Sequence, residues 1–230
     1  MSQEKGCKIV LLGDGGVGKT CIISRYISGQ YDGSTLSTNG ASYCSKRVNF
    51  DQLNKSLLLD VWDTAGQERY RALTKFFYKD AAICILVYDI TKRQTFENLK
   101  NYWYQQLKDN SDKNIVVGIA GNKCDLYEEE EVQENEAREF AESVGAVFEL
   151  TSAANNTGIN ELFMICGYKH LDPNFKPKLG VPAPTPINQT QDTTEKKEEN
   201  KDETKKEEKR NKIVLEQKDF KRNRKKNSCC

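Results

Sequence analysis

The amino-acid sequence predicts a three-layer α/β fold, in which helices cover both faces of a mainly parallel central sheet, followed by a disordered C-terminal tail. Short apolar runs alternate with segments of helical spacing between residues 5 and 172, as parallel strands and crossover helices do. A glycine-rich loop stands between the first apolar run and the first helical segment. From residue 177 onward, charged and polar residues and prolines dominate, and such a segment cannot bury enough apolar surface to offset its chain entropy.

The expected strands are short, apolar and rich in branched residues. The first, CKIVLL at residues 7–12, leads into the glycine loop, and the segment CIISRYI after that loop has helical spacing. The remaining elements alternate, with strands at 56–62, 82–88, 115–120 and 146–150 and helices at 67–79, 94–108, 133–143 and 158–169. Because ligands bind at the carboxyl ends of parallel strands, the loops after these strands form the candidate site.

Composition and charge argue against several classes of protein. The net charge is +1, which is unlike that of a general nucleic-acid binder. The longest apolar run, AAICILVY at 81–88, is far shorter than the ~20 residues of a membrane-spanning helix, and the N-terminus MSQEKG lacks the apolar core of a signal peptide. Most of the first six cysteines lie inside apolar runs, which favours reduced, buried thiols in the cytosol: Cys7, Cys21, Cys44, Cys84, Cys124 and Cys166.

The glycine loop GDGGVGKT, residues 13–20, matches the phosphate-binding pattern G-x-x-x-x-G-K-[ST]. Its glycines let backbone N–H groups converge on a phosphate, and the helix that follows directs its positive end to the same place. Lys19 reaches the outer phosphates in this arrangement, and the Thr20 hydroxyl holds Mg²⁺. The alternative is a chance match in a tight turn, which the strand–loop–helix context disfavours.

The loop DTAGQ, residues 63–67, follows a second strand. Asp63 stands at a strand end beside the phosphate loop, where a carboxylate can hold Mg²⁺, usually through water. The Gly66 N–H can approach a terminal phosphate, and Gln67 can orient a water molecule. Taken alone, the segment is equally consistent with a plain turn.

Two further loops are suited to a base. In NKCD, residues 122–125, the Asp125 carboxylate can accept hydrogen bonds from two adjacent N–H groups, which guanine presents and adenine does not. Asn122 can tie this loop to the phosphate loop, and the Lys123 stem can lie on the base. The small residues of TSA, 151–153, allow a backbone N–H to approach the base; each of these loops is a weak signal alone.

Together, and in this order, the four motifs resemble those of the Ras superfamily of small GTPases, and the likeness spans about residues 6–170. The Rab family is indicated by WDTAGQERYRAL, LVYDIT, GNKCDL and the switch-like segment STNGASY. NGASY, RALTKFFY and IAGNKCDL resemble the early-endosomal group of Rab proteins. The resemblance implies a small G-protein domain of the P-loop NTPase type at 1–172, a disordered hypervariable tail at 173–228, and a prenylated cysteine pair at 229–230.

The resemblance also implies the site residues. Gln67 is expected to position the attacking water, and Thr20, Thr38 and Asp63 to hold Mg²⁺. An aromatic triad of Tyr43, Trp62 and Phe77 is expected to contact effectors, although packing is the alternative. The implied contacts to GTP or GDP are Gly15, Gly16, Val17, Gly18, Lys19, Thr20, Cys21, Tyr31, Thr38, Gly66, Asn122, Lys123, Asp125, Ser152 and Ala153.

Two positions depart from the family pattern. Ala154 replaces the usual Lys and removes packing over the base, which implies weaker nucleotide binding. Asn39 replaces a branched apolar residue in the switch segment and makes the partner-facing surface more polar.

The function implied is a switch that binds GTP with Mg²⁺, hydrolyses it slowly and recruits effectors to membranes. No arginine lies in the phosphate loop, so slow intrinsic hydrolysis is expected, accelerated by a GTPase-activating protein. The other implied partners are a guanine nucleotide exchange factor, effectors, a prenylation escort and a GDP-dissociation inhibitor, and no nucleic acid. The alternatives are an ATP-using P-loop enzyme, a GTP-bound scaffold that does not cycle, and a nuclear-transport or Rho-type branch of the superfamily.

The tail is expected to place this switch on the cytoplasmic face of intracellular membranes, endosomes among them, with a cytosolic pool. Residues 177–230 carry a net charge of +5 against −4 for residues 1–176, and the basic excess lies in the terminal KRNRKKNSCC. Cys229 and Cys230 resemble the double-cysteine ending that receives two geranylgeranyl chains, and two lipids give stable anchoring where one does not. The Lys/Glu-rich stretch 192–212 is expected to be a solvated spacer. Ile213-Val214-Leu215 is either an apolar triplet without a role or, by resemblance, a docking motif for the escort and extraction proteins.

Overall fold

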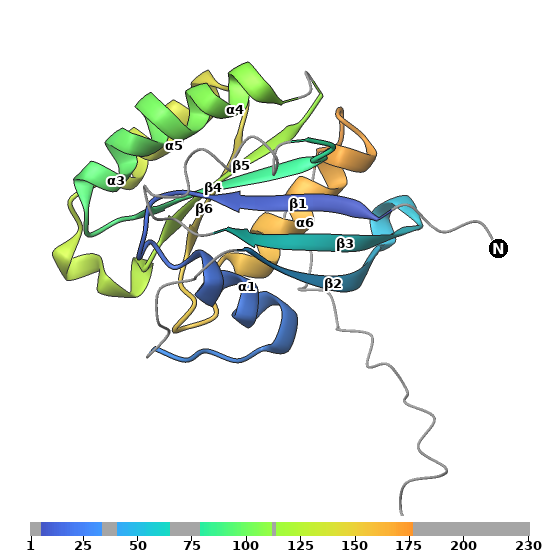
Figure 1. Ribbon diagram of the computed structural model, residues 1–230, viewed down its shortest axis with the longest axis horizontal. Helices are drawn as coiled ribbons and strands as arrows, with labels where there is room; N and C mark the ends of the chain where they lie inside the picture. The colour runs from blue at the N-terminus through green and yellow to red at the C-terminus, as the bar shows by residue number, and fades with distance from the viewer. Residues whose placement is uncertain (1–5, 34–40, 65–78, 112–113, 177–230) are drawn as a thin grey trace, which may run out of the picture. The chain divides into compact units, whose positions relative to one another are not determined.

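The computed structural model describes residues 6–33, 41–64, 79–111 and 114–176 (Figure 1). A six-stranded sheet lies at its centre, with the strand order β2-β3-β1-β4-β5-β6. β1 pairs in parallel with β3 and β4, and β5 pairs in parallel with β4 and β6. The mainly parallel sheet is therefore confirmed. The strands are β1 (Cys7–Leu12), β2 (Ala41–Phe50), β3 (Lys55–Thr64), β4 (Ile83–Asp89), β5 (Val116–Asn122) and β6 (Val147–Thr151).

The edge strand β2 was not expected from the sequence. It pairs antiparallel with β3 over its whole length and turns into it through a short 3-10 segment, Asp51–Leu53. Its sequence ASYCSKRVNF contains no apolar run, because an edge strand with one solvated face needs few apolar residues. Val48 and Phe50 are the residues that it buries in the core.

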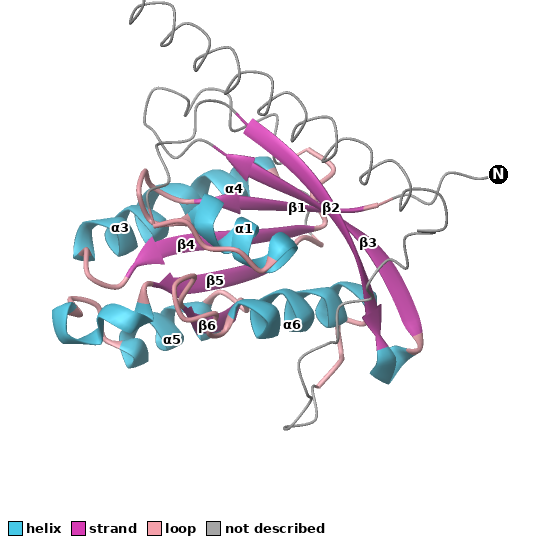
Figure 2. Ribbon diagram, turned by 90° about the horizontal axis from the view of Figure 1, so that it is seen from below, coloured by secondary structure: helices cyan, strands magenta, loops and turns pink. Residues whose placement is uncertain are grey.

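Helices cover both faces of the sheet (Figures 1 and 2). α1 (Lys19–Ser28) and α6 (Ile159–Leu171) pack on one face, in the same core cluster as Ile9 and Leu11 of β1. The opposite face packs on Val10 and Leu12, the intervening residues of β1. Alternate side chains of one strand thus enter two cores, which explains why β1 is apolar without interruption from Ile9 to Leu12. The second face is covered by α3 (Arg93–Asn98), a π-helical turn (Leu99–Trp103), α4 (Tyr104–Asn110) and α5 (Glu134–Ser143).

Most expected boundaries agree with the structure within a few residues. The expected helix 94–108 is the continuous run of α3, the π turn and α4. The expected helix 67–79 lies almost wholly outside the described residues, as does the tail from residue 177. Among the residues described, no helix is long and apolar enough to cross a bilayer.

The cysteines are less buried than the sequence predicts. Cys7, Cys84 and Cys166 are buried, whereas the other three in the described residues are only partly covered: Cys21, Cys44 and Cys124. Burial raises the pKa of the Cys7 and Cys166 thiols to about 12, so neither is a thiolate at neutral pH. None of these six forms a disulfide.

Candidate functional site

The glycine loop connects β1 to α1 and closes against the two neighbouring strands. Gly13 has φ 148°, and a Cβ there would lie 2.2 Å from the Val87 carbonyl oxygen of β4. Gly18 has φ 96°, and its Cβ would lie 2.3 Å from Asn122 Nδ2 of β5. Only glycine fits these positions, because the backbone is left-handed and its neighbours leave no room for a side chain.

Lys19, the first residue of α1, folds back into the glycine loop. Its Nζ donates to the carbonyl oxygens of Gly13 and Asp14, both at 2.9 Å, and the residue is only 5% exposed. Burial lowers the pKa of Lys19 to about 8, and the charges of Asp63 and Asp14 partly oppose this shift. A buried ammonium group of this kind favours an anionic ligand at the loop.

Thr20 and Asp63 meet at the start of α1 and the end of β3. The Thr20 hydroxyl donates to Asp63 Oδ2 at 2.7 Å, and Asp63 is almost completely buried. The sequence predicts Asp63 in the loop after the strand. In the structure β3 continues through Thr64, so Asp63 lies within the strand. A hydroxyl and a carboxylate at one strand end provide the oxygen ligands that Mg²⁺ prefers, so these residues fit that ion.

Asn122 joins the base-side loops to the phosphate loop. The sequence predicts Asn122 in the loop after the strand, whereas in the structure it is the last residue of β5. Its Nδ2 donates to the Val17 carbonyl oxygen at 2.8 Å, which is the tie that the sequence predicts. Its Oδ1 accepts a hydrogen bond of 3.1 Å from Thr151 at the end of β6. The ends of β5 and β6 are therefore held in register with the phosphate loop.

Lys123 and Asp125 follow, Lys123 with a left-handed backbone and Asp125 in the short 3-10 helix Cys124–Glu129. Lys123 has φ 68°, and its Nζ lies 2.6 Å from Oδ2 of Asp89, a fully buried carboxylate at the end of β4. Asp125 accepts a hydrogen bond from the Ser152 hydroxyl through Oδ1. Ser152 and Ala153 are both buried beside it. The sequence analysis did not identify Asp89 as a site residue. Its position at the end of an apolar strand, like that of Asp63 and Asn122, is the pattern that could have indicated it.

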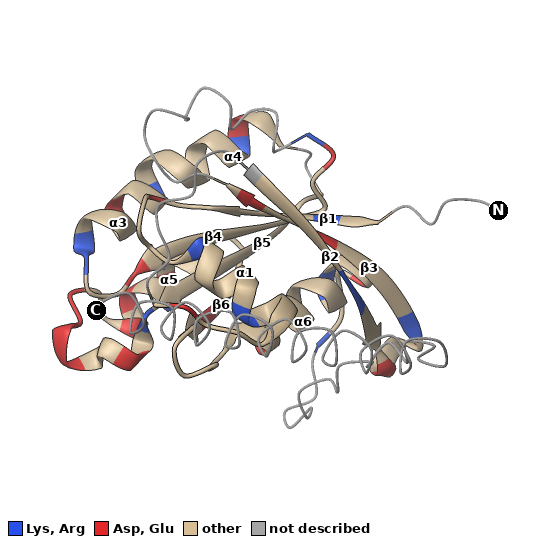
Figure 3. Ribbon diagram, turned by 60° about the horizontal axis from the view of Figure 1, so that its bottom comes forward, with Lys and Arg blue, Asp and Glu red and all other residues tan. Residues whose placement is uncertain are grey.

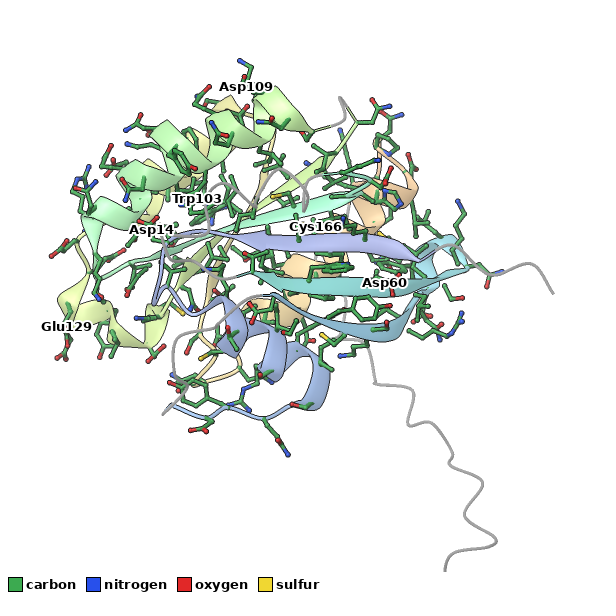
Figure 4. The ribbon with its side chains drawn as sticks, in the orientation of Figure 1. Asp14, Asp60, Trp103, Asp109, Glu129 and Cys166 are labelled. Atoms are coloured by element: carbon green, nitrogen blue, oxygen red, sulfur yellow. The ribbon has the colours of Figure 1, made fainter. Side chains whose placement is uncertain are left out.

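Asp14 is a carboxylate within the phosphate loop whose partners the sequence does not reveal. Its Oδ1 accepts a hydrogen bond of 2.8 Å from Trp103 Nε1, and its Oδ2 accepts one of 2.6 Å from Asn98 Nδ2. Figure 4 shows Asp14 and Trp103 beside each other. The π turn carries Trp103, and such bulges often occur at functional positions.

Three of the aromatic residues that the sequence analysis proposes lie in the described part of the chain: Tyr31, Tyr43 and Trp62. Tyr31 is exposed after the end of α1, with its ring centroid 5.7 Å from the Arg25 guanidinium. Tyr43 of β2 lies opposite Trp62 of β3, with 5.2 Å between the rings, and is 53% exposed. The Tyr43 hydroxyl donates to Asp60 at 2.9 Å. Of the expected aromatic triad, two members are thus neighbours on one sheet face.

Several predicted residues have no structural description. Thr38, Asn39, Gly66, Gln67, Phe77, Cys229 and Cys230 lie outside the described residues. The residues that the structure brings together at the carboxyl ends of the strands come from four separate segments: Lys19 and Thr20, Asp63, Asn122 to Asp125, and Ser152 and Ala153.

Comparison with known proteins agrees with this geometry. The model of the Ras family matches residues 8–171. The chain is 49% identical to human "Ras-related protein Rab-22A" over 158 residues, which cover 68% of the chain and 79% of the relative. It is 46% identical to mouse "Ras-related protein Rab-31" over 71% of the chain and 82% of the relative. It is also 46% identical to the "Putative ras-related protein Rab-5B" of Dictyostelium discoideum, over 75% and 78%.

Proposed function

The chain belongs to the Ras family and, through these relatives, to the early-endosomal group of Rab GTPases, and from this premise we propose that it cycles between GTP-bound and GDP-bound forms as a membrane-recruited switch. The observation that carries the proposal is that three features lie together at the carboxyl ends of the strands: the buried Lys19, the Thr20–Asp63 pair and the Asp125–Ser152 pair. One end of this arrangement suits phosphates and the other suits guanine.

On the phosphate side, Lys19 exchanges its two carbonyl partners for the β- and γ-phosphates, and the N–H groups of residues 15–21 surround them. Thr20, Asp63 and Thr38 would hold Mg²⁺, which neutralises charge on the phosphate oxygens. On the base side, Asp125 accepts two hydrogen bonds from guanine, and Ser152 and Ala153 support it. Asn122 maintains the loop, Lys123 covers the base, and Tyr31 contacts its edge.

Hydrolysis then depends on positioning more than on covalent chemistry. Gln67 orients the attacking water, and no residue of the phosphate loop supplies an arginine, so the intrinsic rate is slow. An arginine from a GTPase-activating protein accelerates such reactions by roughly 10³–10⁵. Loss of the γ-phosphate releases the segments around Thr38 and Gly66, which is the switch.

The proposed partners and location rest on the aromatic residues of the G domain and on the tail. Effectors contact the Tyr43–Trp62 pair together with Phe77, and an exchange factor restores GTP. The G domain covers residues 1–172, the tail 173–228 acts as a spacer, and Cys229 and Cys230 carry lipids after delivery by a prenylation escort. A GDP-dissociation inhibitor maintains the cytosolic pool, and the membrane-bound form works on the cytoplasmic face of endosomes.

The test is single-turnover hydrolysis of GTP with and without a GTPase-activating protein. Gln67→Leu is expected to abolish the stimulated rate while GTP binding persists, whereas Gln105→Leu, an exposed change on α4, leaves the rate unchanged. Absence of turnover in the unmodified protein would support the non-cycling scaffold instead. Displacement of GTP by equimolar ATP would support an ATP-using enzyme.

A further inference from the structure

Arg25 lies in the last turn of α1, and its guanidinium donates to three main-chain carbonyl groups. Its Nε donates to the Ala153 oxygen at 2.7 Å and its Nη2 to the Ala154 oxygen at 3.1 Å. Its Nη1 donates to the Gly29 oxygen at 2.6 Å. A planar guanidinium can hold three acceptors in fixed directions, which a lysine ammonium group cannot reproduce.

These bonds fix the orientation of the loop after β6. In a trans peptide the C=O of one residue and the N–H of the next lie in one plane and point in opposite directions. By holding the Ala154 oxygen, Arg25 therefore directs the Asn155 N–H away from itself. That N–H donates to Ser152 Oγ at 3.0 Å.

Ser152 carries the chain of contacts to the base-side carboxylate. Its hydroxyl accepts from the Asn155 N–H and donates its own hydrogen to Asp125 Oδ1. The path from the Arg25 guanidinium to the Asp125 carboxylate thus consists of one rigid peptide and three hydrogen bonds.

The same guanidinium also holds the segment that leads to the switch region. Gly29 caps α1, donating its N–H to the Arg25 oxygen at 3.0 Å while its own oxygen accepts from Nη1. Tyr31 follows, and its ring lies within cation–π distance of Arg25. One side chain on the phosphate-binding helix therefore contacts the base loop and the segment that precedes the switch-like residues.

We propose that Arg25 is a positioning residue for guanine recognition: it holds the Ser152–Asp125 pair in the geometry that accepts both N–H groups of guanine, and it ties that loop to α1. This inference rests on the proposed function, since it concerns the same nucleotide site. It assigns to Arg25 no contact with the nucleotide.

The test compares GDP with inosine diphosphate, which lacks the 2-amino group of guanine. Arg25→Lys keeps the charge and removes the three-way hold. We expect GDP to dissociate about tenfold faster and the preference for GDP over inosine diphosphate to fall, because a misplaced carboxylate loses its second hydrogen bond. Arg138→Lys, on the distant and exposed α5, is the matched control and should change neither quantity.

A double-mutant cycle separates positioning from general loosening. In a Ser152→Ala background the path to Asp125 is already cut, so Arg25→Lys should no longer change the GDP preference. Equal losses for both diphosphates, or an undiminished change of preference in the Ser152→Ala background, would overturn the inference. The preference is a ratio measured on the same active molecules, so partial unfolding does not affect it. Failure of the unmodified protein to bind GDP would instead contradict the proposed function.

Discussion

At the scale of single residues, the phosphate loop contains both a buried cation and a carboxylate. Asp14 is a negative charge in a loop proposed to bind phosphates, and two unit charges 4 Å apart interact by about 4 kcal/mol at an effective dielectric constant of 20. The structure resolves this conflict because Asn98 and Trp103 cap both carboxylate oxygens and turn the charge toward α3 and the π turn. Asp14 thereby links the loop to the helices on the second face of the sheet.

Removing one of these caps should weaken nucleotide binding. In Asn98→Ala, Asp14 loses a donor, and hydrogen bonds to a charged group contribute roughly 1.5–3 kcal/mol, so GDP affinity measured by titration should fall about tenfold. Asn101→Ala, an exposed change on the same helical run, is the control. Adding Asp14→Ala to Asn98→Ala removes the charge left uncapped and should recover part of the affinity; a further loss would contradict this role.

Lys19 makes nucleotide binding dependent on pH. Its pKa in the nucleotide-free protein is lowered from 10.5 to about 8 by burial, so the folded state binds fewer protons than the unfolded state between these values. This lysine therefore makes folding less favourable below pH 8, and its contribution improves as the pH rises toward 10.5. Phosphate groups favour the ammonium form, so nucleotide binding should take up a proton near and above pH 8.

The measurement is calorimetry at pH 8.5 in two buffers of different ionisation enthalpy. The apparent binding enthalpies should differ by the amount that corresponds to proton uptake. Lys46→Met removes another lysine whose pKa is lowered by burial, but one that bonds to the Tyr26 oxygen and not to the loop, so uptake should persist. Identical enthalpies in the two buffers for the unmodified protein would contradict the prediction, because they would show that binding takes up no proton.

At the scale of elements, α6 is held against the edge strand by a glycine. Gly167 lies within the helix, where glycine is less favourable than alanine by about 1 kcal/mol. A Cβ at this position would lie 2.3 Å from Cζ of Phe50, the fully buried last residue of β2. Close approach of helix and strand explains why glycine stands where helix propensity disfavours it.

Gly167→Ala should therefore lower the free energy of unfolding, against the sign that helix propensity predicts. Overpacking of this kind costs about 1–3 kcal/mol, measurable by urea denaturation at a constant GDP concentration. Phe50→Leu shortens the opposing side chain, so the penalty for Gly167→Ala should shrink in that background. A stabilised Gly167→Ala protein would show that β2 can move away without cost.

At the scale of the whole molecule, charge is distributed unevenly along the chain. Residues 125–142 contain nine acidic residues and one basic residue, and Figure 3 colours the acidic positions of α5 and of the segment before it red. An anionic membrane surface would repel this end of the G domain. The basic residues at 221–226 and the proposed lipids at Cys229 and Cys230 would then supply the attraction.

Replacing both terminal cysteines should separate location from chemistry. Cys229→Ser with Cys230→Ser is expected to move the protein from the membrane fraction to the supernatant and to leave single-turnover GTP hydrolysis unchanged, because neither thiol is among the residues proposed to bind GTP. Ser228→Ala keeps both thiols and serves as the control. Continued membrane binding of the double variant would mean that something other than these lipids anchors the chain.

The sequence alone determined the alternation of parallel strands and helices, the four loops at the strand ends and the residues of the phosphate loop. These follow from local patterns, in which apolar runs and glycine motifs need no distant partner to be read. It did not reveal β2, whose polar sequence becomes a strand only by pairing with β3.

Only the tertiary structure decided how distant polar groups pair. Asp89 with Lys123, Asp14 with Asn98 and Trp103, and Arg25 with the loop after β6 join residues that no sequence spacing relates. The physical reason is that each is a buried or partly buried polar group that must find a partner where strand ends converge. Local sequence patterns thus place the site at the strand ends, and the folded arrangement of those ends determines which polar side chains pair there.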